Sequence, residues 1–213
     1  MSLSPLTSNL GQHRAKHLLR RACFHYNKIL LDVISNMNVE QALDYLLQDN
    51  SISYQEPFDP LPSDNPHGYW LSSNEYPPDI PNQGRKRGLL SQWWFYNMVN
   101  RNNLKDKLLF FLHTTFTISK GDVGASHYFY DHLKLLEHYC DGNLRELAKK
   151  ITLDNAMLNY LDNTQNNANN PNENYAREFL ELFTITKGEQ IGEGDLSLIH
   201  ISEPTRQEAI SYA

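Results

Sequence analysis

Polar residues able to do chemistry gather late in the chain, within residues 170–183. Five of them recur at spacings of three and four: Glu173, Asn174, Arg177, Glu178 and Glu181. A helix would place side chains with these spacings on one face. Carboxylates beside an amide and a guanidinium can move protons or orient a substrate. The alternative is a solvated ladder of i,i+4 ion pairs, each stabilising the helix by about 0.3–0.5 kcal/mol, and spacing alone favours this ladder.

His113 is the residue that could complete such a site. It lies within residues 104–116, which are apolar nearly all round, so we expect a helix in the centre of the core and a buried imidazole. A buried imidazole needs a hydrogen-bond partner, and a satisfied core histidine is the plainer interpretation. The chemical interpretation makes His113 a general base or a ligand of a divalent metal ion, with Glu178 and Glu181 as carboxylate partners.

Arg20 and Arg21 are a second set of candidate ligand-binding residues, together with Asn172 and Glu173. Each guanidinium can bind a carboxylate of another helix through two donors. A network of these arginines with Glu178 or Glu181 would be a structural alternative to catalysis, because it would perturb the same pKa values. His127, Asp131 and His132 are interpreted as a surface group, since a metal site needs three or four ligands and no HExxH spacing is present.

The elements that must position these residues are helices. Asn170 as N-cap, Pro171 at the first helical position and Glu173 three residues after the cap predict where the last helix begins. Its expected apolar stripe consists of Tyr175, Ala176, Phe179, Leu180, Leu182 and Phe183. Apolar periodicity and caps predict further helices at residues 13–22, 39–47, 89–100, 104–116, 126–139 and 143–161.

Residues 50–88 interrupt this helical pattern. Seven of the ten prolines lie between Pro57 and Pro81, so we expect a long Pro/Asn-rich loop arm there. No β alternation is apparent along the chain. The predicted fold class is therefore all-α, an irregular multi-helix bundle.

Composition narrows the class of protein. The formal charge of −6 argues against nucleic acid as a partner, which would favour a basic surface. Cys23 and Cys140 are too few for a disulfide framework. No apolar run approaches the roughly 18 residues of a transmembrane helix, and residues 1–12 lack the apolar stretch of a secretory signal. Cytoplasm is the default expectation.

We expect that residues 196–213 do not belong to the natural protein. LSLIHISEPTR, the variable QEA and the final ISYA resemble an in-frame translation of a sequencing adapter, a sample barcode and a primer. We expect residues 1–195 to be the N-terminal part of a single helical domain, truncated before its C-terminus. An intact genomic copy encoding residues 196–213 would contradict this interpretation.

Five blocks together resemble one large bacterial family, the domain-of-unknown-function family 1800. They are HLLRRA (17–22), FFLHTTF (110–116), GNLREL (142–147), AMLNYLDN (156–163) and NENYARE (172–178). The resemblance implies a mostly helical protein that continues beyond this chain. Family members often carry a Phe-Trp-His-Asn-His-Phe block; Leu112 and Thr115 stand at two of its positions here, so His113 lacks a second histidine in that block.

The resemblance also bears on function. Genes of this family commonly lie beside genes of a second, sulfatase-like family that often carries an export signal, which implies a shared pathway and envelope association as the alternative location. With the resemblance, a functional site on the polar face of residues 173–181 is as well supported as the solvated ladder of ion pairs. The enzyme hypothesis is hydrolase-type acid–base or metal-assisted chemistry, with His113 as base or ligand, Glu178 and Glu181 as carboxylates, and Arg177 and Asn174 as orienters. The alternative is a non-catalytic binding or assembly protein with a structural Arg/Glu/His network.

Overall fold

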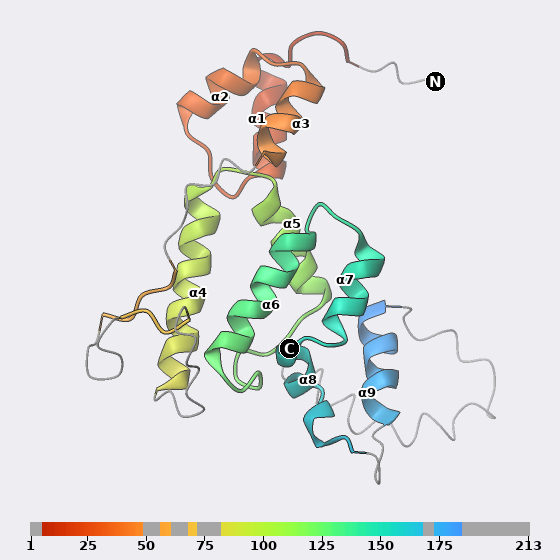
Figure 1. Cartoon of the computed structure of the whole chain (residues 1–213). Helices are drawn as coiled ribbons and strands as arrows, with labels where there is room; N and C mark the ends of the chain where they lie inside the picture. The colour runs from red at the N-terminus through yellow and green to blue at the C-terminus, as the bar shows by residue number, and fades with distance from the viewer. Residues whose placement is uncertain (1–5, 49–55, 61–67, 72–81, 168–172, 185–213) are drawn as a thin grey trace, which may run out of the picture. The chain divides into compact units, whose positions relative to one another are not determined.

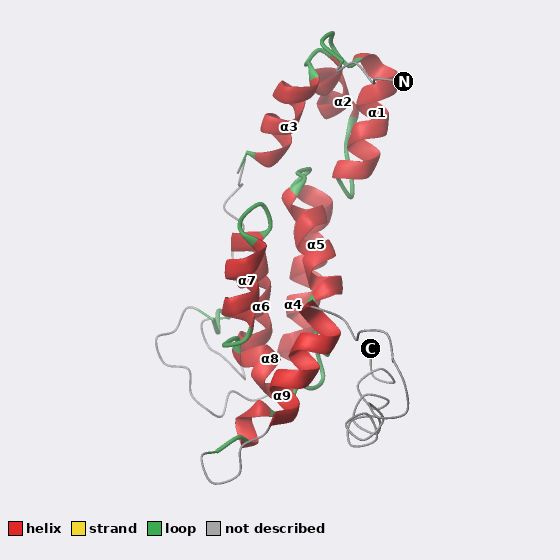
Figure 2. Ribbon diagram, turned by 90° about the vertical axis from the view of Figure 1, so that its right-hand side faces the viewer, coloured by secondary structure: helices red, strands yellow, loops and turns green. Residues whose placement is uncertain are grey.

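The computed structural model describes residues 6–48, 56–60, 68–71, 82–167 and 173–184 (Figure 1). Helices and loops make up this part of the chain, and Figure 2 shows no strand element within it. The all-α fold class is therefore confirmed. Asn170, Pro171, Asn172 and the segment 196–213 lie outside the described residues.

The chain divides into two compact units, unit 1 (Met1–Phe111) and unit 2 (Leu112–Ala213). Each unit is described by itself. The expected single domain over residues 1–195 stays a prediction.

Unit 1 begins with three helices, α1 (Gly11–Ala22), α2 (Lys28–Ser35) and α3 (Val39–Leu47). The Asn27 side chain accepts from Leu30 N at 2.9 Å and so caps α2. Asn38 starts α3 with a reciprocal capping box to Gln41, as its residue type predicts. The three helices share one core, whose fully buried members are Ala15, Leu19, Ile34, Ala42 and Leu46.

Helix α4 (Gln83–Asn100) begins earlier than the expected Leu89, so the predicted arm boundary at residue 88 is wrong. Residues 83–88 have no apolar periodicity, but they contain no proline that would stop a helix. The buried residues of α4 are Lys86, Leu90 and Asn97, which its spacing places on one face. Because a lysine and an asparagine lie on the buried face, apolar periodicity does not predict where this helix begins.

The described pieces of the arm pair with each other before α4. Phe58 and Tyr69 form an isolated antiparallel bridge, and Asp59 N donates to Gly68 O at 2.7 Å. Gly68 has φ +72°, and a Cβ there would lie 2.0 Å from the Phe58 ring, so only glycine fits. This pairing fixes Asp59 and Trp70, whose exposed fractions are 1% and 2%.

Helix α5 (Lys105–Thr115) is buried along one stripe rather than all round. Leu109, Leu112 and Phe116 are buried, whereas Phe110 is 42% and Phe111 63% exposed. We expected this helix, apolar nearly all round, in the centre of the core, and the exposed Phe110 and Phe111 show that this expectation is wrong. A continuous apolar run hides which face packs, because it carries no periodic contrast.

Unit 2 contains α6 (Ser126–Tyr139), which packs against α7 (Leu144–Ile151) and α8 (Asn155–Tyr160). A short 3₁₀ turn, η1, follows at Asn163–Gln165. The single helix expected at residues 143–161 is thus two helices. Asp154 separates them, because its side chain accepts from Met157 N at 3.1 Å and caps a new helix.

The last described helix changes pitch partway. It is an α-helix, α9, over Glu173–Glu178 and a π-helix, η2, over Phe179–Thr184. Tyr175, Phe179 and Phe183 are buried at steps of four residues, with ring centroids 6.2 and 6.0 Å apart in succession. The expected stripe holds for these three residues and fails for Ala176 and Leu180, which are exposed. A π turn holds more residues than an α turn, so the buried face advances in steps of four.

Candidate functional site

Glu178 lies where the α-helix becomes a π-helix, and it is buried. Its exposed fraction is 7%, so its expected place on a solvated face is wrong. The Asn174 side chain donates from Nδ2 to Glu178 Oε1 at 2.8 Å, and Arg177 Nη2 donates to Asn174 Oδ1. A guanidinium thus holds an amide, and the amide holds a buried carboxylate. Glu178 follows the buried Tyr175 by three residues, so α-helical spacing places it at the edge of the buried face.

The surroundings of Glu178 favour its protonated form. Burial raises the pKa of this carboxyl above its ordinary value; the Asn174 hydrogen bond and Arg177 lower it, and Asp162 and Glu181 raise it. The net direction is upward, because loss of water outweighs the donors. An upward shift of its pKa suits a carboxyl group that donates a proton. Its field also reaches α8, where it contributes, after burial and Asp122, to the raised pKa of Tyr160.

His113 packs its ring beside two aromatic rings of α6. The centroid distances are 5.8 Å to His132 and 6.3 Å to Phe129. The residue is partly buried, and burial, followed by the charge of His132, lowers the pKa of His113 to about 4. The imidazole is therefore neutral at physiological pH, the form that a general base or a metal ligand needs. Its pairing with Glu178 or Glu181 stays a prediction.

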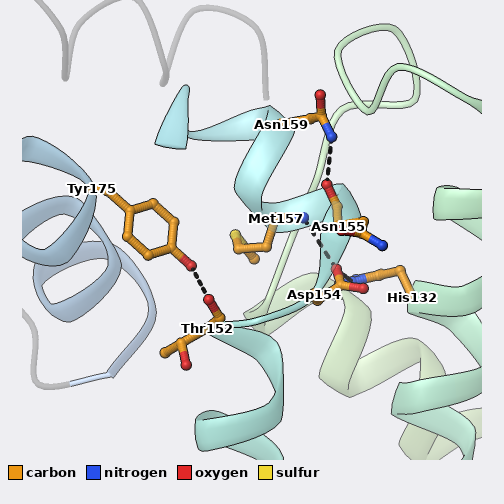
Figure 3. A network of polar contacts seen from close by, with 7 residues as sticks. All are labelled: His132, Thr152, Asp154, Asn155, Met157, Asn159 and Tyr175. Atoms are coloured by element: carbon orange, nitrogen blue, oxygen red, sulfur yellow. Dashed lines mark hydrogen bonds and ion pairs between the residues drawn. The ribbon is translucent and has the colours of Figure 1, made fainter. Parts of the chain in front are cut away.

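His132 is the functional candidate that the sequence interpretation missed. It is fully buried, not a surface residue, and its Nδ1 lies 2.8 Å from Asp154 Oδ2. The same carboxylate oxygen accepts from Met157 N, so Figure 3 shows one acid joining α6 to the start of α8. A signal was available, because Phe129, Leu133 and Leu136 place His132 inside the apolar stripe of α6. Asp131 is exposed, as predicted.

The two ring nitrogens of His132, Nδ1 and Nε2, differ in their hydrogen-bond partners. With Asp154 as acceptor, Nδ1 donates to the carboxylate. Nε2 is buried and has no hydrogen-bond partner among the described residues. Within the same residues no three His, Cys, Asp or Glu side chains converge to hold a metal ion.

Tyr175 fastens α9 to the junction of α7 and α8. Its hydroxyl donates to Thr152 O at 2.8 Å (Figure 3), and burial, with a contribution from Asp154, raises the pKa of Tyr175 to about 12. The phenol stays protonated and acts as a hydrogen-bond donor. This bond brings the helix that carries Glu178 to the corner that carries Asp154.

The remaining predicted site residues are spread over both units. Arg20 and Arg21 are exposed in α1 of unit 1. Glu181 is half-buried in η2 of unit 2, so its network with the arginines stays a prediction. Glu173 begins α9, but its side chain and all of Asn172 lie outside the described residues.

Comparison with protein families gives one match, described as a protein of unknown function (DUF1800), over residues 17–197. The chain belongs to the DUF1800 family. No curated protein and no solved structure matches it. The DUF1800 match contains His113, His132, Asp154 and Glu178, so each candidate residue lies in family sequence. No helix in the described part of the chain is long and apolar enough to cross a membrane.

Proposed function

We propose that this DUF1800 protein is a hydrolase-type enzyme that uses acid–base chemistry in unit 2. Glu178 is the proton donor, and Asn174 with Arg177 orients it. The observation that carries the proposal is the burial of the Glu178 carboxyl against the Asn174 amide, with its pKa raised by that burial. Structural carboxylates are more usually exposed or paired directly with a cation. The site lies at a π-helical turn, a feature frequent at functional sites.

A histidine supplies the base in this proposal. His113 is neutral above about pH 4, as a proton acceptor must be. Asp154 orients His132 beside it, in the arrangement of a carboxylate that fixes an imidazole tautomer.

The second candidate is a non-catalytic assembly protein. It is favoured by the Asp154 and Tyr175 bonds, which also serve to fasten α6, α8 and α9 together. Envelope association and a sulfatase-like partner remain proposals.

The test is hydrolysis of a panel of p-nitrophenyl esters, phosphates and glycosides by the full-length protein and by Glu178→Gln. Glutamine keeps the shape of the side chain but cannot give up a proton. We expect kcat to fall by about 10²–10³-fold, the scale of a lost general acid. The high-pH limb of the rate profile should disappear with it, since that limb reports deprotonation of the acid.

Glu146→Gln is the matched control, because Glu146 is an exposed glutamate paired with Lys149. It should leave kcat unchanged. If the full-length protein hydrolyses none of the panel, or Glu178→Gln folds and retains full activity, the enzyme proposal fails. In the second case the assembly role is preferred.

A further inference from the structure

Positive charge is concentrated near the start of a chain that is acidic as a whole. The formal net charge is −6, yet no Asp or Glu occurs in residues 1–31. The same residues contain five cations, which are Arg14, Lys16, Arg20, Arg21 and Lys28. Helix α1 has no acidic residue in its first turn and ends on two arginines. This part of unit 1 is therefore a basic region that an anionic partner could recognise.

The packing of α1 turns these cations toward solvent. Ala15, Leu19 and Ala22 are the buried residues of the helix, and they belong to the core shared with α2 and α3. At 100° per residue, the four cations of α1 lie on the side opposite this buried stripe. All four are exposed, as is Lys28 at the start of α2. Among the residues that the structure describes, no ion pair involves any of the five cations.

The basic corner (residues 20–29), where α1 turns into α2, adds apolar surface to this charge. Ile29, in the first turn of α2, is 75% exposed, and Phe24 is 37% exposed. The Phe24 ring packs edge-on against Phe110, with their centroids 5.6 Å apart, and Lys107 Nζ lies 3.9 Å from the centre of the Phe24 ring. These contacts hold Phe24 in place and bring a further cation beside the basic corner.

Cations beside an exposed aliphatic side chain suit a membrane surface better than other anionic partners. A bilayer with anionic phospholipids presents headgroup phosphates and, about 5–10 Å deeper, the ends of apolar acyl chains. A nucleic acid offers phosphates but no apolar layer for Ile29. The net negative charge of the chain does not prevent the approach, because exposed charges more than about 8 Å away are largely screened at physiological ionic strength.

We propose that the basic corner binds the surface of a membrane that contains anionic phospholipids. Its three cations contact the headgroup phosphates, and Ile29 enters the boundary between headgroups and acyl chains. Lys107 and the other exposed cations of α1 strengthen the attraction. The surface lies in unit 1 and does not depend on the Glu178 chemistry.

Co-sedimentation of the full chain with vesicles tests the proposal. Vesicles of phosphatidylcholine alone are compared with vesicles of phosphatidylcholine and phosphatidylglycerol. We expect binding to be at least about ten-fold tighter on the anionic vesicles, and to weaken as sodium chloride is raised, because salt screens the charges. Equal binding to both kinds of vesicle overturns the proposal, and so does the absence of binding to the anionic ones.

The double variant Arg20→Gln/Arg21→Gln tests the headgroup contacts. Each cation near an anionic surface strengthens binding about five-fold, so we expect the variant to bind roughly 20–30-fold more weakly. Arg145→Gln/Lys150→Gln is the matched control, because it removes two exposed cations from α7 and changes the net charge equally. The control should bind as the unmodified chain does. Equal losses in the two double variants would show that net charge, and not the basic corner, governs binding.

Ile29→Ser distinguishes a bilayer from an acidic macromolecule. Serine cannot gain from the acyl boundary, so we expect about three- to ten-fold weaker binding to the anionic vesicles. Leu153→Ser makes the same kind of change at a side chain that is 74% exposed in unit 2, and it should have no effect. Unchanged binding by Ile29→Ser contradicts a bilayer partner and favours an acidic protein or a nucleic acid in its place.

Discussion

Asp154 and Glu178 are both buried carboxylates, yet their neighbours differ in kind. Asp154 accepts from the His132 ring and from Met157 N, two donors fixed by the fold. Glu178 accepts from Asn174, a side-chain amide that Arg177 holds in turn. The first carboxylate serves as a tie between helices. Burial displaces the pKa of Glu178 upward, which suits a group that exchanges a proton.

His113 makes the folded state sensitive to acid. Its pKa is lowered to about 4, whereas the unfolded chain takes up this proton near the ordinary value of 6.5. Below pH 6.5 the unfolded state binds more protons, so stability falls as pH drops from 6.5 toward 4. We expect His113 to account for a loss of about 2–3 kcal/mol. Urea unfolding at pH 7 and pH 4.5 measures it.

The comparison is made between the unmodified chain and His113→Gln, because their difference cancels the other titrating groups. His113→Gln should lose less stability than the unmodified chain over this interval. His138→Gln, an exposed histidine of α6, should lose as much as the unmodified chain. Equal losses in all three chains would mean that His113 is not protected from protons in the folded state.

At the scale of elements, periodicity predicted the positions of the helices better than it predicted which of their faces are buried. Asn38 and the aromatic steps Tyr175, Phe179 and Phe183 could be predicted, because caps and regular spacing are local signals. The burial of Glu178 could not be predicted, because this residue lies at the border between the apolar stripe and the polar face, where spacing alone does not decide burial. The burial of Lys86 was equally hidden, since charge normally marks an exposed face.

Helix α5 offers a direct test of which side of a helix is buried. Leu112 is 6% exposed and Phe111 63% exposed, although both are large apolar residues side by side in the sequence. Leu112→Ala should destabilise the fold by about 2–4 kcal/mol through a cavity. Phe111→Ala should cost less than about 1 kcal/mol, because most of its ring is already in water. Urea unfolding of the two variants decides, and equal losses would restore the predicted all-round burial of α5.

For the whole molecule, the sequence predicted the fold class and the family, whereas the single domain expected over residues 1–195 stays a prediction beside the two compact units. Composition and helical spacing sufficed for an all-α chain, since both are summed over many residues. The two units rest on long-range packing that no local pattern encodes. The His132–Asp154 bond is of the same kind, because its partners are 22 residues apart along the chain.

The shared core of α1, α2 and α3 predicts a local response to mutation. Leu19 is fully buried in that core, so Leu19→Ala should cost about 3 kcal/mol. Hydrogen exchange followed by mass spectrometry should show faster exchange in peptides of α1–α3, while peptides of α6–α8 keep their rates. Leu136→Ala, at a fully buried position of α6, should give the reverse pattern. Uniform acceleration along the chain in both variants would show that the two units unfold as one.

The π-helical turn at Phe179–Thr184 also has a consequence for how DUF1800 sequences are aligned. A wide turn accommodates one residue more than an α turn over the same rise, so an insertion or deletion here changes pitch without breaking the helix. A relative one residue shorter between these positions would run as an α-helix throughout. The counterpart of Phe183 would then lie about 100° away around the axis. Gaps within this segment therefore mark a change of helical face, and an alignment that shifts them elsewhere would equate residues that lie on different faces of the helix.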